Sequence, residues 1–243
     1  PRVRRQRQMC IRDRHEADDF AVTEVFVQAV NQSIDLVFLC QPNNPTGQIT
    51  PPELVQRLVR RCADCGAVLV VDECFLDFLQ QRDALTAKPL LQTAPNLVIL
   101  KAFTKLYAMA GVRLGYALCS NTALLAKMQA AGQPWGVSSL AQAAGAAALR
   151  ETAYADAVRA LIADQRPKLA AGLRALGLQV IEGSANYLLF RAPETLGAAL
   201  QQRSVCLRSC GNYPGLSAGW YRTAVRTAPE NEQLLQTMRE VLK

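Results

Sequence analysis

Apolar residues in the first half of the chain gather in short, uninterrupted runs. Three of these runs are rich in β-branched residues and do not alternate with polar positions; they span residues 35–40, 67–73 and 96–103. Such runs are typical of strands buried on both faces of a parallel sheet. Between the first two, Thr50 and the prolines after it mark the start of a helix, and Gly66 marks its end. The pattern predicts a strand–helix–strand unit, followed by a further strand at 113–119.

The second half of the chain has a different pattern, in which long helical stretches precede short strands. Alanine-rich segments at 138–149 and 151–176 predict two helices. Short strands are then expected in "LQVIEG", "NYLLFR", "VCLRSC" and "WYRTAVRT", with helices at 193–203 and 230–242. We therefore expect an α/β fold with a mainly parallel sheet flanked by helices, plus a small α+β C-terminal domain. Residues 17–135 would form part of the large domain, and 136–243 the connecting helices and the small domain.

The formal net charge of +7 is concentrated at the start of the chain. Residues 1–14 hold six arginines and one aspartate, which gives +5. The remaining charges are of both signs and interspersed, whereas a nucleic-acid interface needs a basic face on the folded body. We interpret residues 1–16 as a non-native segment and expect no nucleic-acid partner. No uncharged apolar run approaches the roughly 18 residues of a membrane span, so no membrane association is expected.

Cysteine and histidine usage narrows the chemistry. Several of the eight cysteines lie within apolar runs, as is typical of buried thiols in a reducing compartment, so we expect a cytoplasmic location. Cys62 and Cys65 form a single CxxC pair, which predicts a helix end rather than zinc, and no metal is expected. The only histidine, His15, precedes the folded body. Catalysis must therefore use lysine, arginine, carboxylates or a cofactor.

Polar groups follow three of the predicted strands. Asn44 lies after 35–40, Asp72 ends 67–73, and Lys105 follows 96–103. Because the carboxyl ends of parallel strands form one edge of a sheet, these groups would converge there. A lysine amine, a carboxylate for a pyridine nitrogen and an amide for a ring oxygen suit pyridoxal phosphate. Each residue alone also fits a solvated side chain, a helix cap or a turn; their joint occurrence favours a site.

Three motifs resemble the signatures of class I/II, fold-type I pyridoxal-phosphate enzymes, over roughly residues 17–243: "NNPTG", "VVDECFLDF" and "TKLYAMAGVRLGY". The resemblance implies that Lys105 binds the cofactor covalently and acts in catalysis. It also implies that Asp72 pairs with the pyridine nitrogen, that Asn44 holds the ring oxygen and that Arg113 binds the phosphate.

Two positions depart from the pattern of the wider family. Ala102 stands where the family usually has a phosphate-binding serine, so Thr104 or backbone amides would have to compensate, or the affinity for the cofactor falls. Phe75 stands three residues after Asp72, where many aminotransferases have a tyrosine that donates to the ring oxygen. The resemblance also implies that the family's N-terminal third is missing here. That absence puts the activity of the chain as written in question, and we expect a homodimer at full length.

Within the family, the sequence resembles the branch of histidinol-phosphate aminotransferases and L-threonine-O-3-phosphate decarboxylases. "QPWGVSSLAQ", "LRSCGNYPGL" and "YRTAVRTAPENEQLL" look like the decarboxylases. This implies that Arg222 binds the substrate carboxylate, with Arg208 and Asn44 beside it. We expect decarboxylation of L-threonine O-3-phosphate to (R)-1-aminopropan-2-ol O-phosphate, in cobalamin biosynthesis. The alternatives are histidinol-phosphate aminotransfer and a non-catalytic remnant.

Overall fold

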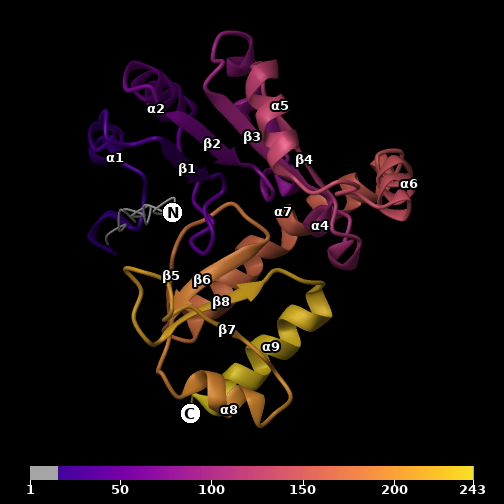
Figure 1. Cartoon of the computed structure of the whole chain (residues 1–243). Coiled ribbons are helices and arrows are strands. Elements are labelled where there is room, and N and C mark those ends of the chain that lie inside the picture. Colours follow the sequence, from indigo (N-terminus) through magenta and orange to yellow (C-terminus); the bar gives the residue numbers. More distant parts are fainter. Residues whose placement is uncertain (1–15, 243) are drawn as a thin grey trace, which may run out of the picture.

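Two sheets, one after the other along the chain, organise the fold (Figure 1). The structure, a computed structural model, describes residues 16–242. The expected non-native segment, 1–16, therefore lies almost entirely outside the described residues. Sheet A and its helices form the upper part of Figure 1, and sheet B with the last two helices forms the lower part.

Sheet A has four strands in the order β1-β2-β3-β4. The first three are parallel, and β4 is antiparallel to β3. Twelve residues, 103–114, connect β3 to β4, and β4 returns along β3 in the opposite direction. The strands are β1 (Leu36–Cys40), β2 (Val68–Asp72), β3 (Leu97–Ala102) and β4 (Gly115–Leu118).

Of the two long helices beside sheet A, α2 (Pro52–Asp64) buries an apolar side in the core, whereas α5 (Thr122–Ala131) has no buried residue. In α2 the buried residues recur at helical spacing, and Gly66 takes the left-handed conformation after the helix, with φ +74°. The other long helix, α5, begins after an asparagine cap. The short elements are η1 (Glu16–Asp18), α1 (Glu24–Gln28), η2 (Leu76–Phe78), α3 (Arg82–Leu85), η3 (Lys88–Gln92), α4 (Phe103–Leu106) and η4 (Ala110–Val112).

Two helices link the sheets. The first, α6 (Ser139–Ala148), projects from the side of the molecule in Figure 1. The second, α7 (Thr152–Ala175), runs between the two parts, and its buried Ile162 and Leu169 share one core with Leu76 from the first part and Phe190 from the second. Because this core contains side chains from both parts, the two sheets are packed together rather than connected by a free linker.

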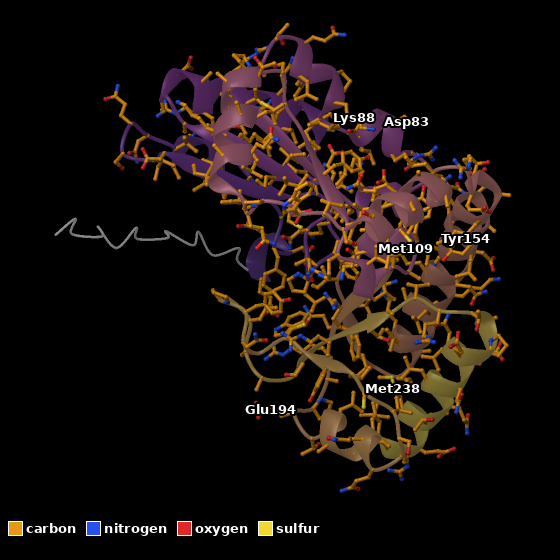
Figure 2. The ribbon with its side chains drawn as sticks, turned by 45° about the vertical axis from the view of Figure 1, so that its right-hand side comes forward. Asp83, Lys88, Met109, Tyr154, Glu194 and Met238 are labelled. Carbon is orange, nitrogen blue, oxygen red and sulfur yellow. The ribbon has the colours of Figure 1, made fainter. Side chains whose placement is uncertain are left out.

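Sheet B is antiparallel, with the strand order β5-β6-β8-β7. Helices α8 and α9 cover it, and Met238 from α9 is fully buried in the lower part of the molecule (Figure 2). The elements are β5 (Gln179–Val180), β6 (Tyr187–Arg191), α8 (Leu196–Gln201), β7 (Arg208–Ser209), β8 (Trp220–Ala224) and α9 (Ala228–Val241).

The structure confirms the expected fold class, a mainly parallel sheet flanked by helices. The predicted strand and helix positions agree with the observed elements to within a few residues at their ends. The proposed boundary at 135 falls between α5 and α6, and the division into two domains stays a prediction. Within residues 16–242, no helix is both long and apolar enough to cross a membrane.

Candidate active site

The carboxyl edge of sheet A carries the three residues that the sequence places at strand ends. Asp72 is the last residue of β2 and pairs in register with Cys40 of β1 and Leu100 of β3. Asn44 lies in the turn after β1, and Lys105 lies in α4, directly after β3. Because the three strands are adjacent and parallel, the turns that bear these residues lie along one edge of the sheet.

The turn that carries Asn44 is held rigidly at both ends. The Gln41 side chain donates to Thr50 O and accepts from Thr50 N, each over 2.8 Å, and closes the base of the turn. Inside it, Asn43 Nδ2 donates to Thr46 Oγ1 over 2.8 Å. Three of these polar side chains, Gln41, Thr46 and Thr50, are 3% exposed or less, so their mutual hydrogen bonds replace those lost to water.

Sheet B reaches this turn through Arg222. Arg222 Nη1, from β8, donates to Asn44 Oδ1 over 2.5 Å. The same guanidinium lies over the Tyr187 ring, 5.0 Å from its centroid. Tyr187 OH in turn donates to Asn43 O over 2.9 Å, and burial raises the pKa of this phenol far above its usual range. The predicted substrate residues Asn44 and Arg222 are therefore in direct contact.

Arg208 lies directly opposite Arg222 in the β7–β8 pair. Directly opposed side chains share a face of the sheet, and two like charges in this position repel each other. Arg208 Nη2 donates to Asn212 Oδ1 over 3.1 Å, and its guanidinium lies 5.8 Å from the Tyr213 ring centroid. Burial raises the pKa of the nearby Cys210 thiol, and the charges of Arg222 and Arg208 oppose that rise. The opposed pair is suited to an anionic ligand.

Phe75 links Lys105 to the rest of the site. Lys105 Nζ lies 5.7 Å from the centroid of the Phe75 ring, and Lys105 itself is exposed. Phe75 also contacts Tyr187. The two rings pack edge to face, with their centroids 5.1 Å apart. Aromatic contacts thus connect the lysine amine to the ring beneath Arg222.

Asp72 is half-buried and keeps one carboxylate oxygen close to its own chain. Its Oδ1 accepts from Cys74 N over 3.0 Å. Burial, followed by the hydrogen bond and charge of Asp72, raises the pKa of Cys74 to about 12. Cys74 is therefore a neutral thiol near neutral pH.

The predicted phosphate-binding residues lie on the segment between β3 and β4. Thr104 is half-buried in α4, and Ala102 ends β3 without a side chain that could cap α4. Arg113 is exposed and left-handed, with φ +57°, and its Nη1 donates to Ala110 O over 3.0 Å. The guanidinium is thus turned back on its own loop, and its role in phosphate binding stays a prediction.

Sequence reasoning did not single out two features of this edge. One is Tyr187, whose only signal is an aromatic residue at the start of a predicted strand. The other is a buried ion cluster of Lys101, Glu73 and Asp77, in which Lys101 Nζ lies 3.0 Å from Glu73 Oε2 and 2.8 Å from Asp77 Oδ1. A lysine inside the apolar run of β3 was the available signal, since a buried charge needs a partner.

A hollow of about 620 Å³ lies away from these residues. Its lining includes Val68 at the start of β2, Asn96 just before β3, and Lys127 from α5. These positions mark the amino edge of the parallel strands, opposite the edge that bears Asp72. The hollow is therefore separate from the candidate site.

Sequence comparison establishes the class of protein that this fold and this edge define. The family model described as aminotransferase class I and II matches residues 12–238, so the chain belongs to that family. Members of this family depend on pyridoxal phosphate. An exposed lysine, a carboxylate and an amide at adjacent strand ends are consistent with that cofactor.

Individual relatives carry two different names. The chain is 37% identical to threonine-phosphate decarboxylase of Salmonella typhimurium, over 93% of this chain and 63% of that protein. It is 32% identical to histidinol-phosphate aminotransferase of Lactiplantibacillus plantarum, over 92% of this chain and 61% of that protein. The chain thus spans less than two thirds of the length of these relatives. A solved structure, histidinol-phosphate aminotransferase from Clostridium acetobutylicum, superposes with a TM-score of 0.88 at 24% identity, over 93% of this chain and 69% of that one, and supports the fold.

Proposed function

We propose that this chain belongs to an enzyme that binds pyridoxal phosphate through Lys105 and decarboxylates L-threonine O-3-phosphate. The product would be (R)-1-aminopropan-2-ol O-phosphate, a building block for cobalamin synthesis in the cytoplasm. The observation that carries the proposal is the opposed pair Arg208 and Arg222 on sheet B, of which Arg222 contacts Asn44 at the edge of sheet A that also bears Lys105.

The residues at this edge have complementary roles toward the cofactor. When bound, pyridoxal phosphate supplies an electron sink for negative charge that develops on the substrate. Lys105 Nζ would hold it covalently, and the exposure of this lysine leaves room for attachment. The Asp72 carboxylate would keep a proton on the ring nitrogen, and the amide of Asn44 would donate to the ring oxygen. Thr104 and Arg113 would bind the phosphate, with Phe75 beside the ring.

The positive charges of the opposed arginines Arg208 and Arg222 support a substrate with two anionic groups. Two guanidinium groups that face each other repel, and a ligand with two anionic groups relieves that repulsion. Phosphothreonine has a carboxylate and a phosphate, so Arg222 would bind the carboxylate and Arg208 would lie close to either anion. The hydrogen bond between Arg222 and Asn44 already aims the Arg222 fork at the site.

Which bond at the substrate Cα is cleaved depends on how Arg222 orients the substrate carboxylate. If Arg222 held the bond from Cα to the carboxylate perpendicular to the ring of a bound cofactor, that bond would overlap the π system of the ring and loss of CO2 would be favoured. Lys105, once displaced from the cofactor, can then donate the proton that replaces the carboxylate. Phe75, which has no hydroxyl group, removes a donor to the ring oxygen and supports the decarboxylase over the aminotransferase.

Histidinol-phosphate aminotransfer is the second candidate, because a relative with that name is 32% identical to this chain. A remnant that keeps the fold without catalysis is the third, but Lys105, Asp72, Asn44 and Arg113 are all present, which argues against decay. We also propose a homodimer. Its support is α6, which contains no charged residue and exposes Leu140 (83%), together with the exposed Trp135 (95%) just before it.

One experiment separates these functions. The purified protein is incubated with phosphothreonine, and with histidinol phosphate plus 2-oxoglutarate, while CO2 and glutamate are measured. We expect CO2 from phosphothreonine, its loss in Arg222→Ala, and its retention in Arg191→Ala, a surface arginine of the same sheet. Glutamate from histidinol phosphate without CO2 from phosphothreonine would replace the decarboxylase with the aminotransferase. No product and no borohydride-trapped cofactor would favour the remnant.

A further inference from the structure

The ion cluster beneath the site is almost completely shielded from water. The Lys101 side chain is 2% exposed and the Glu73 side chain 0%, whereas that of Asp77 is 31% exposed. Glu73 also accepts from Ala87 N over 2.7 Å and from Thr86 Oγ1 over 2.8 Å. These partners lie on the segment between α3 and η3, which Asp83 and Lys88 mark in Figure 2. Every charge in the cluster therefore has a short contact.

The lysine at its centre stays protonated. Burial lowers the pKa of Lys101, but the charge of Glu73 and the hydrogen bond and charge of Asp77 outweigh that effect, and the net shift is upward. Lys101 therefore holds two carboxylates at once, because an ammonium group has three donors. A neutral side chain at this position could not hold both.

The two carboxylates bracket the segment that presents Phe75. Glu73 precedes Phe75 by two residues and Asp77 follows it by two, so Lys101 grips this loop on both sides of the ring. Asp77 O also accepts from Arg159 Nη1 of α7 over 3.2 Å, which ties the same loop to the linking helix. Lys101 belongs to β3, and the chain continues from it directly into α4 with Lys105.

We propose that Lys101 is a positioning residue for the site: through Glu73 and Asp77 it fixes the 73–77 segment, so that Phe75 lies against the Lys105 amine and Asp72 keeps its place at the end of β2. The inference rests on the proposed function in that Lys105 is the cofactor-binding lysine. Lys101 itself, at 2% side-chain exposure, does not touch cofactor or substrate.

A purely structural role would make a different prediction, so the test separates stability from geometry. Lys101→Met leaves Glu73 buried without its ion-pair partner and is expected to destabilise the fold. Lys101→Met combined with Glu73→Gln removes the unpaired charge, and the new amide can still accept from Ala87 N. The double variant should regain stability, but it still lacks the ion pair and hydrogen bond that Lys101 makes with Asp77. Lys101→Arg keeps the charge and serves as the rescue variant.

Two readouts are taken on variants whose circular dichroism matches that of the parent chain. The first uses no cofactor: limited acetylation with acetic anhydride, with peptide mass spectrometry of Lys105 relative to the exposed Lys127. We expect the ratio in the double variant to rise about three-fold as the amine loses the ring beside it. The second is the dissociation constant for pyridoxal phosphate, expected to rise about ten-fold from lost geometry. Lys101→Arg should stay close to the parent in both.

The control is Asn231→Ala, which breaks a buried hydrogen-bond network between α9 and α7, away from the site. It should lower stability and leave both readouts unchanged. A well-folded double variant with the parent's acetylation ratio and cofactor affinity would overturn the proposal, as would equal changes in Asn231→Ala. If the parent chain does not bind pyridoxal phosphate at Lys105, the proposed function fails, and the acetylation ratio still decides whether Lys101 positions Phe75 and Lys105.

Discussion

Lys101 and Lys105 lie four positions apart in the sequence, yet they belong to two opposite kinds of region. Lys101 belongs to the interior cluster, where each charge has a partner within 3.0 Å and the side chains of Lys101 and Glu73 are 2% exposed or less. Lys105 belongs to the open edge, where its amine is exposed and its described contact is the face of Phe75. Full pairing makes a charge structural, because nothing remains for a ligand to bind. Incomplete pairing leaves charges available, as with Lys105 and the opposed arginines Arg208 and Arg222.

The largest difference between the two lysines is expected in covalent labelling by the cofactor. Lys105→Ala should abolish borohydride-trapped labelling by pyridoxal phosphate, because the interior lysine cannot substitute for it at 2% side-chain exposure. Peptide mapping after reduction measures the label. Lys127→Ala, which removes an exposed lysine from α5, should leave the label intact. Label on any other lysine of the parent chain would show that exposure and strand-end position do not identify the reactive amine.

Disrupting the interior cluster should lower the free energy of unfolding. Glu73→Ala leaves the Lys101 ammonium with Asp77 alone and leaves Ala87 N–H without its acceptor. We expect the free energy of unfolding to fall by about 3–5 kcal/mol, measured by urea denaturation. Asp164→Asn breaks the exposed ion pair with Lys168 and should cause a barely measurable change. Equal losses in the two variants would contradict the importance of burial.

A loss of similar size should appear in catalysis, and not in stability, at Asp72. Asp72→Asn keeps the side-chain shape and removes the negative charge that would hold a proton on the cofactor's ring nitrogen. The barrier should rise by roughly 3–4 kcal/mol, while cofactor affinity changes little. Turnover and affinity are measured on the same preparation, and near-normal turnover would remove Asp72 from its proposed role.

The contact between the two sheets should respond to a smaller change. A Cβ on Gly183 would lie 2.5 Å from Thr46 O and 3.0 Å from the Gly47 backbone. Gly183→Ala should therefore destabilise the chain by about 1–3 kcal/mol and weaken substrate binding by shifting the turn that carries Asn44. Gly136, like Gly183, has no positive φ, and a Cβ there would meet only Gln133 O at an ordinary 3.5 Å, so Gly136→Ala should change stability little. Equal effects of the two variants would show that the close contact with Thr46 is not responsible.

The smallest effect is expected at a fully exposed pair. Hydrogen bonds from Arg226 and then Thr227 lower the pKa of Glu230 from 4.5 to about 2, within the capping box of α9. A lowered pKa stabilises the fold above pH 4.5, and that contribution is lost as the pH falls from 4.5 through 2. Glu230→Gln should flatten this part of the stability–pH curve slightly. An identical curve for the parent and the variant would exclude the contribution.

Much of the fold could be predicted from the sequence because its signals are local. The β-branched runs locate the strands of sheet A, and Gly66 locates the end of α2, since both depend on neighbouring residues only. The positions of Asn44, Asp72 and Lys105 followed from one topological rule about strand ends. The antiparallel direction of β4, by contrast, had no such signal, because a connection of twelve residues is also long enough for a crossover to a parallel strand.

The remainder depended on pairings that are distant in sequence. That Arg208 opposes Arg222 requires the register of β7 and β8, which a two-residue strand leaves open. That Tyr187 lies between Phe75 and Arg222 requires the packing of sheet B against the edge of sheet A. Lys101 within β3 indicated that a buried partner of opposite charge exists. Which residues these are could not be predicted, because Glu73 and Asp77 follow β2 in the chain and contact Lys101 only when β2 and β3 are adjacent.

The hydrogen bond from Phe103 N to Leu114 O, 3.2 Å long, closes residues 103–114 into a loop with fixed ends. Lys105 lies near one end of this loop and Arg113 near the other, so its length sets how far apart they can be. An inserted residue would leave the sheet intact and change only that span. Insertions and deletions should therefore be more frequent in the exposed stretch 201–204 than here. An alignment of related genes would test this, and frequent length variation within 103–114 would contradict it.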